Sequence, residues 1–181
     1  MSGHASQGAT AGVALPALPL AGGCQCGQLR YRLHEAPLTL YCCHCRECQA
    51  QSASAFGMSM RCASHAVEWS GEAAHFARDE GKPTSAEGLF CPHCGTRIMH
   101  RRSRLSGAMA EADDGDEHEA SAGGVSIKAG SLDDTSWLRP VGHIWLRSAQ
   151  PWFVPAAGLV LFDGQPDDWT PLVDAWTRAL A

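Results

Sequence analysis

Apolar and polar residues alternate with a period of two in several short segments of this chain. The alternation is clear in residues 29–33, 56–60 and 125–129, and residues 143–147 have the composition of a strand. Because successive side chains of a strand point to opposite faces, this pattern predicts half-buried β-strands. Glycine, proline and serine repeatedly interrupt the apolar segments. We therefore expect a mostly β domain built from short strands.

A helical period occurs only near the C-terminus. Counted from Trp169, apolar residues follow after three, four, seven and eleven positions, at Leu172, Val173, Trp176 and Leu180. This spacing places them on one face of a helix, and Pro171 suits the first turn of that helix. Residues 156–181 are therefore predicted to form a C-terminal extension whose amphipathic helix packs against the domain.

Composition and charge limit the partners of the protein. The chain has 181 residues, enough for one domain with extensions. Its 14 Lys and Arg against 19 Asp and Glu give a net charge of −5, so we exclude a generally basic surface and expect no nucleic-acid partner.

The acidic residues are concentrated in one segment. Six of them lie in residues 111–119, inside a stretch rich in Gly, Ala and Ser, and we expect an acidic, mobile insertion at 107–124. A basic run precedes it: Arg97, Arg101, Arg102 and Arg104. We interpret this run as a polar strand edge, with a phosphate-binding patch as the alternative.

The first 21 residues are predicted to be a disordered leader. An apolar run begins at Gly12, but no Lys or Arg precedes Arg30 and two prolines interrupt the run, which does not fit a signal peptide. No run of about 18 apolar residues exists, so no membrane span or membrane partner is predicted. We expect a cytoplasmic protein, in which reduced thiols favour metal binding over disulfides. The domain itself is expected at residues 22–155.

Nine cysteines provide the candidate chemistry. Eight of them fall in three close groups: Cys24 and Cys26; Cys42, Cys43, Cys45 and Cys48; Cys91 and Cys94. Thiols this close converge on one point when the chain turns, and Gly27 and Gly95 follow two of the groups, as tight turns require. Zinc prefers such tetrahedral thiolate sites. A disulfide framework conflicts with the odd count and with the adjacent Cys42 and Cys43.

The spacing leaves open how the groups combine. Cys45 and Cys48 would combine with Cys91 and Cys94 in a zinc ribbon. Alternatively, Cys24 and Cys26 would join Cys91 and Cys94, which leaves Cys43, Cys45 and Cys48 as a group of three. The difference matters because four protein ligands close a zinc site, whereas three leave a position for water or a substrate.

In chain order, the motifs resemble those of the glutathione-dependent formaldehyde-activating enzyme family, which includes centromere protein V. The resemblance extends from about Gly22 to Trp152 and is interrupted by the acidic insertion. It is carried by the segments Gly23–Tyr31, Cys43–Gln49, Ser54–Gly57, Phe90–Thr96, Ala129–Asp134 and His143–Trp145.

The resemblance implies a zinc-bound β-tent of folded antiparallel sheets. It also implies the ligands of two zinc ions: Cys24, Cys26, Cys91 and Cys94 for a closed structural site, and Cys43, Cys45 and Cys48 for a catalytic site with an open position. The implied enzyme is a carbon–sulfur lyase or synthase that acts on a glutathione–formaldehyde adduct, with glutathione as co-substrate and a small thiol and an aldehyde as partners. A non-catalytic zinc-stabilised module is the alternative, either carrying glutathione or aldehyde or docking a protein.

Four further residues have a chemical and a structural interpretation. Phe56 would form a wall of the glutathione site or belong to the core. Asp133, Asp134 or His143 would transfer a proton. The structural alternatives are turn capping for the two aspartates and a hydrogen bond within a strand for His143.

The remaining cysteines and histidines are secondary candidates. Cys42 would replace Cys43 as a ligand if the spacing Cys42-x-x-Cys45 is used. Cys62 is interpreted as a buried bystander rather than a nucleophile. His44 and His93 lie between cysteines and would act as ligands only in place of a thiol.

Overall fold

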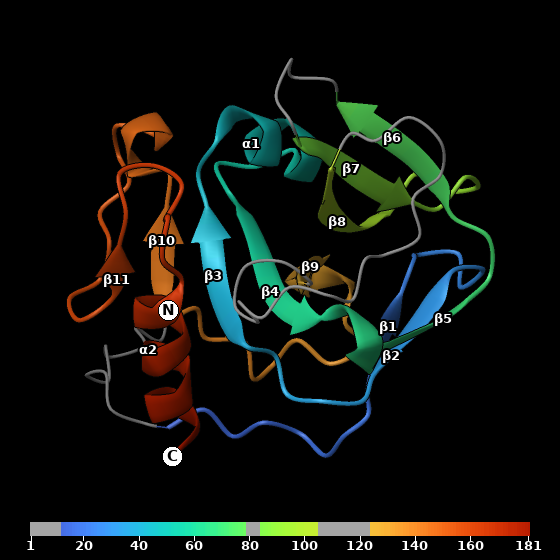
Figure 1. Ribbon diagram of the computed structural model, residues 1–181, viewed down its shortest axis with the longest axis horizontal. Helices are drawn as coiled ribbons and strands as arrows, with labels where there is room; N and C mark the ends of the chain where they lie inside the picture. The colour runs from blue at the N-terminus through green and yellow to red at the C-terminus, as the bar shows by residue number, and fades with distance from the viewer. Residues whose placement is uncertain (1–11, 79–83, 105–123) are drawn as a thin grey trace, which may run out of the picture.

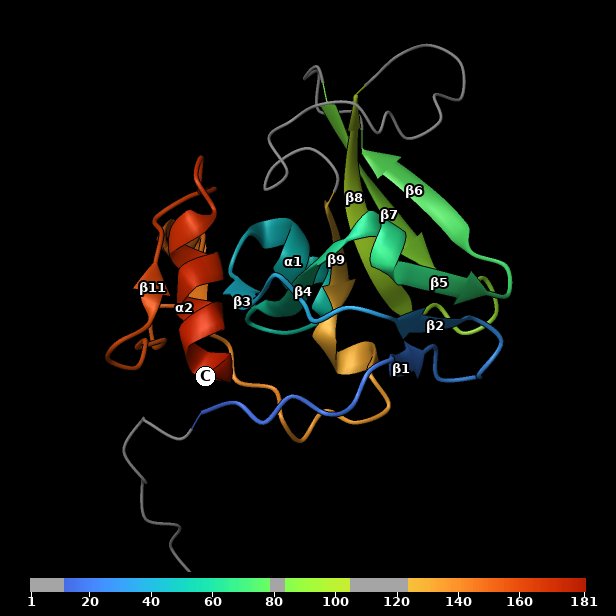
Figure 2. The same cartoon turned by 60° about the horizontal axis from the view of Figure 1, so that its bottom comes forward.

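The computed structural model describes residues 12–78, 84–104 and 124–181, and their strands form two sheets. The larger sheet has eight strands in the order β11-β10-β3-β4-β9-β8-β7-β6, and the smaller has three in the order β1-β2-β5. Figures 1 and 2 show the small sheet on the right and the C-terminal helix on the left of the molecule. The prediction of a mostly β fold with a short C-terminal helix is confirmed.

The strands of the large sheet are β3 (Thr39–Cys43), β4 (Gly57–Ala63), β6 (Ala74–Arg78), β7 (Thr84–Phe90), β8 (Arg97–Arg104), β9 (Gly124–Lys128), β10 (Gly142–Ile144) and β11 (Val160–Leu161). Those of the small sheet are β1 (Leu20–Gly23), β2 (Arg30–Leu33) and β5 (Val67–Ser70). The helices are α1 (Arg46–Ser52) and α2 (Thr170–Leu180), with 3₁₀ turns at Ser64–Ala66, Ala129–Ser131 and Leu146–Ser148.

The alternating segments become strands for the reason their pattern suggests. In β2, Tyr31 and Leu33 are buried whereas Arg32 is exposed, because only one face of this strand packs on the core. In contrast, β3 is buried along its whole length. It lies between β10 and β4 in the sheet, and α2 packs against it.

The strand expected at residues 143–147 is shorter than predicted. β10 ends at Ile144 because Trp145 adopts the left-handed conformation, with φ 62°, which a strand cannot continue. β10 pairs in parallel with both β3 and β11, whereas the other strand pairs of the described residues are antiparallel. A parallel neighbour requires a long connection rather than a hairpin, and here β3 and β10 are about 100 residues apart in the chain.

Helix α2 buries the apolar face that its periodicity predicts. Leu172 and Trp176 are buried, and the indole of Trp176 contacts Trp137 with ring centroids 6.3 Å apart. The Thr39 hydroxyl of β3 donates a hydrogen bond to the Leu172 carbonyl at 2.9 Å. The helix therefore covers the large sheet near β3, which is the strand that leads into the second cysteine group.

Parts of the expected leader and insertion lie outside the described residues, namely 1–11 and 105–123. In the described part of the leader, Val13 is buried and its N–H donates to the Ala179 carbonyl of α2 at 2.6 Å. Leu20, also within the expected leader, begins β1. Residues 12–21 therefore pack against the fold at both ends.

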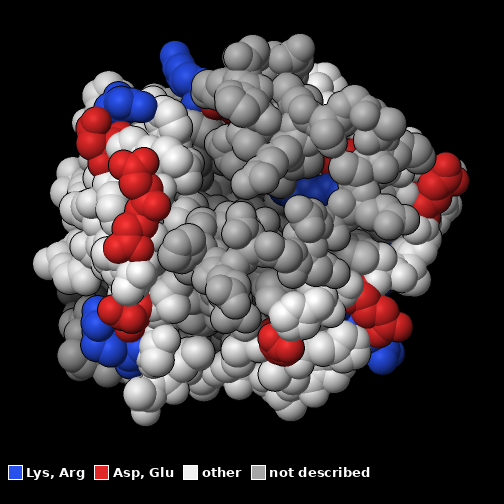
Figure 3. Space-filling view, viewed as in Figure 1, with Lys and Arg blue, Asp and Glu red and all other residues white. Residues whose placement is uncertain are grey.

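Acidic side chains occupy one edge of the molecule. Exposed carboxylates occur along the C-terminal extension, at Asp163, Asp167, Asp168 and Asp174. Figure 3 shows acidic side chains in a column on the left of this face, where Figure 1 places the C-terminal extension above α2 and the start of α2. Among the described residues, neither α-helix is long and apolar enough to cross a membrane.

Candidate metal centres

Two turns from different sheets form the first cysteine group. Cys24 and Cys26 lie between β1 and β2, and Cys91 and Cys94 lie between β7 and β8. The Gly27 N–H donates to the Cys24 carbonyl at 3.1 Å, and the Gly95 N–H donates to the Cys91 carbonyl at 2.9 Å. The φ angles of the two glycines, 78° and 71°, are those that glycine tolerates without steric cost. Each turn therefore presents its two sulfurs on one side.

The geometry of these four thiols fits a tetrahedral metal ion. Their sulfur atoms all lie within 4.8 Å of one another, and the Cys24–Cys26 and Cys26–Cys91 sulfurs are 3.4 and 3.6 Å apart. Zinc–sulfur bonds of about 2.3 Å in a tetrahedron require sulfurs about 3.8 Å apart. All nine cysteines of the chain are free thiols, so the disulfide alternative is wrong.

Backbone and hydroxyl groups around this cluster favour thiolates. The Leu29 N–H points at the Cys24 sulfur at 3.2 Å. Hydrogen bonds from the side chain and backbone of Thr96 lower the pKa of Cys94 to about 5, and the two side-chain atoms are 3.2 Å apart. Because thiolates, not thiols, bind metal, these contacts prepare the cluster for an ion.

The second cysteine group lies where β3 passes into α1. Cys43 ends the strand, Cys45 is the N-cap of the helix, and Cys48 is in its first turn. The Cys45 sulfur accepts a hydrogen bond from the Cys48 N–H at 3.3 Å. Residues three apart lie on the same face of a helix, so the two thiols converge with that of Cys43. The three sulfurs lie within 4.8 Å of one another.

The buried amide of Gln49 holds α1 in this position. Its nitrogen donates to the His44 carbonyl at 2.7 Å and to the Ser148 carbonyl at 2.8 Å. The second contact connects α1 with the 3₁₀ turn that follows β10. The sequence analysis did not predict α1, because a seven-residue helix is too short to show an apolar period.

The second group already contains one stabilised thiolate. Hydrogen bonds from Cys43 and Cys45, together with the charges of Lys128 and Arg97, lower the pKa of Cys48 to about 3. The same thiol contacts raise the pKa of Cys43. Three converging thiols with a thiolate among them fit a metal ion that keeps one further coordination position.

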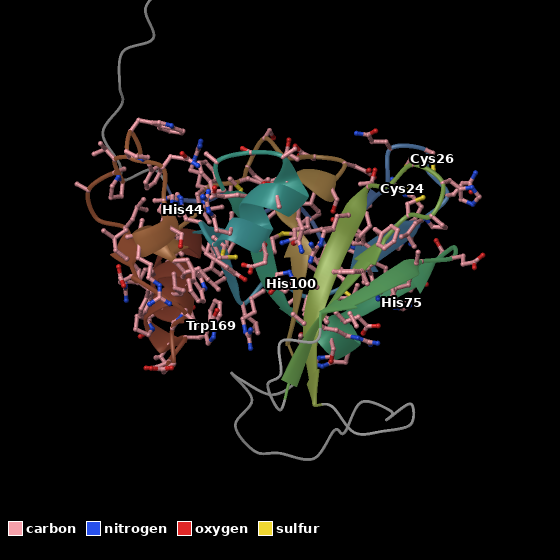
Figure 4. The ribbon with its side chains drawn as sticks, turned by 90° about the horizontal axis from the view of Figure 1, so that it is seen from above. Cys24, Cys26, His44, His75, His100 and Trp169 are labelled. Atoms are coloured by element: carbon pink, nitrogen blue, oxygen red, sulfur yellow. The ribbon has the colours of Figure 1, made fainter. Side chains whose placement is uncertain are left out.

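A cavity of about 460 Å³ connects the two groups, with Cys48 of the second and Cys94 of the first in its wall. Gln25, Arg97 and Lys128 also line it. Figure 4 shows Cys24 and Cys26 on the right and His44, next to the second group, on the left. The cavity therefore lies between the two cysteine groups.

Phe56 and His143 belong to an aromatic cluster that does not line this cavity. The His44 and His143 rings are hydrogen-bonded, Nε2 to Nδ1, at 2.9 Å, and both rings pack on Phe153 and Phe56. Burial, together with the charge of His44, lowers the pKa of His143 to about 4. The pair is therefore neutral at pH 7 and joins the end of β3 to β10.

The two aspartates are used in structural contacts. Asp133 forms a bidentate ion pair with the half-buried Arg30, and one of its two contacts is 3.0 Å. Asp134 accepts a hydrogen bond from the Ser136 N–H at 2.9 Å, which is the turn-capping role considered for it. Neither residue lines the cavity.

The secondary candidates lie outside both sulfur groups. Cys42 is buried, and burial raises its pKa to about 12; it is adjacent to Cys43 in a strand, so its side chain leaves the opposite face. Cys62 is fully buried, and burial likewise raises its pKa to about 12. His93 is exposed, whereas His44 points into the aromatic cluster.

The two cations of the cavity, Arg97 and Lys128, were not recognised from the sequence pattern. Arg97 was assigned to a polar strand edge together with Arg101, but only Arg97 lines the cavity, whereas Arg101 is exposed and donates to Glu87 at 2.6 Å. Lys128 was not singled out. Their positions in the sequence could have indicated this role, because Arg97 directly follows the motif Phe90–Thr96 and Lys128 directly precedes the motif Ala129–Asp134.

Comparison with known proteins agrees with the motifs. No curated protein matches this chain. A crystal structure of a Rhodobacter sphaeroides protein is similar at 13% identity and a TM-score of 0.45, covering 67% of this chain and 92% of that one. The family model described as glutathione-dependent formaldehyde-activating enzyme matches residues 19–148. The chain therefore belongs to the glutathione-dependent formaldehyde-activating enzyme family.

Proposed function

We propose that the protein is a zinc-dependent carbon–sulfur lyase or synthase that interconverts glutathione plus formaldehyde with S-hydroxymethylglutathione. The observation that carries this proposal is the group of Cys43, Cys45 and Cys48, which supplies three ligands and reaches the wall of a cavity through Cys48. Three protein ligands are typical of catalytic zinc sites, because the fourth position is left for a substrate. Membership of the family supports glutathione and formaldehyde as the reactants.

The two cysteine groups have different roles in this proposal. The four thiols of Cys24, Cys26, Cys91 and Cys94 would hold a structural zinc ion, since they complete a tetrahedron. The three thiols at the start of α1 would hold a second ion. When bound there, zinc supplies a position that keeps an incoming thiol in its nucleophilic thiolate form.

In this proposal the residues of the chain position the glutathione sulfur and the aldehyde, rather than strongly polarising the aldehyde carbonyl. In the forward reaction the glutathione thiol loses its proton to water, and its sulfur forms a bond with the aldehyde carbon. The carbonyl π-electron pair moves to oxygen, and that oxygen takes a proton from water, so that no net proton is gained or lost. The cavity beside Cys48 has the volume that a small peptide needs, and a peptide bound there would have its sulfur next to the three thiols. Gly57, whose missing Cβ would lie 3.5 Å from the Cys48 Cβ, leaves this approach open.

A non-catalytic carrier of glutathione or aldehyde is the second candidate. It is favoured by one observation: among the described residues that line the cavity, there is no His, Asp or Glu that would act as a general base. In either case we propose a cytoplasmic protein, because both groups require reduced thiols, and a zinc domain at 22–155 with an extension beyond it.

The test combines zinc content with formaldehyde exchange. Zinc per chain is measured for the wild type and Cys45→Ser, and exchange between glutathione and S-hydroxymethylglutathione is followed by NMR against the protein-free rate, because thiols also add to formaldehyde unaided. The lyase predicts two zinc ions and accelerated exchange for the wild type. It predicts one ion and the protein-free rate for Cys45→Ser.

Cys62→Ser is the matched control, because it removes a thiol that belongs to neither group. It should keep both ions and the exchange rate of the wild type. A folded Cys45→Ser protein that accelerates exchange as the wild type does would exclude the proposed site. A wild type that binds two ions and glutathione without accelerating exchange would identify the carrier instead.

A further inference from the structure

A segment that follows β10 packs against the helix of the second cysteine group. The family match ends at residue 148, and this support segment comprises residues 148–153. The Gln49 side-chain nitrogen donates a hydrogen bond to the Ser148 carbonyl at 2.8 Å, and the Gln150 side-chain nitrogen donates to the Gln49 oxygen at 3.0 Å. The second of these contacts therefore comes from beyond the matched region.

All the polar atoms of the Gln49 side chain are hydrogen-bonded. Its nitrogen also donates to the His44 carbonyl at 2.7 Å, and its oxygen also accepts from the Arg46 guanidinium at 3.4 Å. Because carbonyls only accept hydrogen bonds, the nitrogen must face them, and the amide has one orientation. The side chain is 8% exposed. A buried amide with every group paired is rigid, so Gln49 fixes the His44 carbonyl relative to the support segment.

The His44 backbone is held on both sides by another part of the chain. Its N–H donates to the Ile144 carbonyl of β10 at 3.0 Å, and its carbonyl accepts from Gln49. His44 lies between two of the three thiols, those of Cys43 and Cys45. Its peptide groups are the direct connection between these two residues, so these hydrogen bonds restrict how the two sulfurs lie relative to each other.

The His44 side chain is held from the same direction. Its Nε2 is hydrogen-bonded to Nδ1 of His143 at 2.9 Å, and its ring packs on Phe153 of the support segment with centroids 4.4 Å apart. His44 is fully buried, and neither its side chain nor that of Gln49 lines the cavity. The residue between the two thiols is therefore fixed through its backbone and its ring.

The second cysteine group needs such support more than the first. In the first group a fourth thiol completes the tetrahedron, so that a bound ion itself holds four side chains in place. In the second group three thiols leave one position to a ligand from outside the chain. Residues that hydrogen-bond around metal ligands fix the orientation of these ligands, and their loss typically weakens metal binding by about 10–100-fold.

We propose that Gln49 is a positioning residue for the second metal site and that Ser148 and Gln150 of the support segment anchor it. The inference rests on the proposed function, which assigns an ion with an open position to Cys43, Cys45 and Cys48. It deepens that function, because the affinity and geometry of the open site then depend on a segment that extends beyond the matched region. Gln49 takes no part in bond formation.

The test measures zinc affinity at each cysteine group separately. Zinc is withdrawn from the wild type and from Gln49→Met by a chromophoric chelator, and the Cys45→Ser protein shows which step belongs to the second group. Methionine has nearly the length of glutamine but makes none of the hydrogen bonds. We expect Gln49→Met to bind zinc at the second group about 10–100-fold more weakly and at the first group as the wild type does.

Cobalt provides a readout that a loss of stability alone would not change. Cobalt(II) accepts the same tetrahedral thiolate sites, and its visible absorption depends on the number and arrangement of the thiolates. In Gln49→Met that is folded by circular dichroism, the contribution of the second group to the spectrum should change and that of the first should not. A wild-type spectrum and zinc affinity, or equal weakening of both ions, would overturn the proposal.

Two further variants complete the series. Gln150→Met removes a single hydrogen bond and should weaken the second ion by about two- to tenfold; it decides the question if Gln49→Met does not fold. An unchanged second group in Gln150→Met would overturn the role of the support segment. Gln51→Met is the matched control for metal binding, because this glutamine of the same helix lies at the cavity instead. It should keep the wild-type affinity for both ions.

The result is independent of catalysis. Weaker zinc binding at the second group of Gln49→Met, with no accelerated formaldehyde exchange by the wild type, would refute the lyase and leave the positioning role intact. Accelerated exchange by the wild type, with unchanged zinc binding in Gln49→Met, would refute the positioning role and leave the lyase intact.

Discussion

The two cysteine groups should differ in their effect on stability, and the structure gives the size of the difference. The first group joins Cys26 to Cys91, which are 65 residues apart in the chain. It also connects the turn between two strands of the small sheet with the turn between two strands of the large one. The second group joins Cys43 to Cys48, within one short segment.

Each metal cross-link stabilises the fold by the chain entropy that it removes from the unfolded state, and this entropy depends on the length of the loop that it closes. Closing a 65-residue loop restricts the unfolded chain by about 4 kcal/mol, and closing the loop from Cys43 to Cys48 by about 2 kcal/mol. The double variant Cys91→Ser/Cys94→Ser removes one whole turn from the first group. Loop closure alone makes this a loss of at least about 4 kcal/mol, or at least about 8–16 °C in Tm for a domain of this size. The binding energy of the ion, typically about 10–16 kcal/mol, adds to this and brings the variant to the limit of stability or below it.

The matched variant is Cys45→Ser/Cys48→Ser, which also exchanges two thiols for hydroxyls. Thermal unfolding of both zinc-loaded variants is followed by circular dichroism, and bound zinc is measured in each. The variant of the first group should unfold at the lower temperature although each protein has lost one ion. An equal Tm for the two variants, or a higher Tm for the variant of the first group, would refute the loop-closure argument.

Three further predictions concern the core, the histidine pair and the metal. Trp176→Ala should cost about 3–5 kcal/mol of unfolding free energy in urea, because Trp176 is 1% exposed. Trp152→Ala, at 67% exposed, should change it by less than about 0.5 kcal/mol, and equal losses would contradict the packing described for α2. Because burial lowers the pKa of His143 to about 4, the unfolded state binds more protons than the folded state between about pH 4 and 6.5. Stability should therefore fall as the pH decreases through this range, with a shallower slope for His143→Gln; identical slopes would show that the His44–His143 pair does not stay neutral. Removal of zinc by a chelator under reducing conditions should abolish the circular dichroism signal of the fold, since a zinc site of this kind typically supplies about 10–16 kcal/mol against a total stability of about 5–15 kcal/mol. An apo protein with an unchanged spectrum and Tm would contradict a structural role for the ion.

Local patterns in the sequence predicted much of the secondary structure. Residues 29–33 and 125–129 became strands where the alternation placed them, and the helix from Thr170 buries the residues that its period predicts. Helix α1 was not predicted because its seven residues are too few to show a period, and the strand predicted at 143–147 was too long, since β10 has only three residues. Tertiary contacts, rather than propensity, determine where such elements begin and end.

The cysteine sites, like the fold, were predicted where neighbouring residues determine them and not where distant residues meet. Close spacing of cysteines and a following glycine depend on neighbouring residues only, so the sequence by itself determined that Cys24 with Cys26, and Cys91 with Cys94, form turns whose thiols could hold a metal ion. Which turns meet is a contact between residues 65 positions apart, and spacing cannot decide it. The tertiary structure decided this, and it also placed Arg97 and Lys128, from two paired strands, in the same cavity wall as Cys48. The physical reason is that a turn is specified by the backbone of a few residues, whereas a cavity exists only where distant strands pack together.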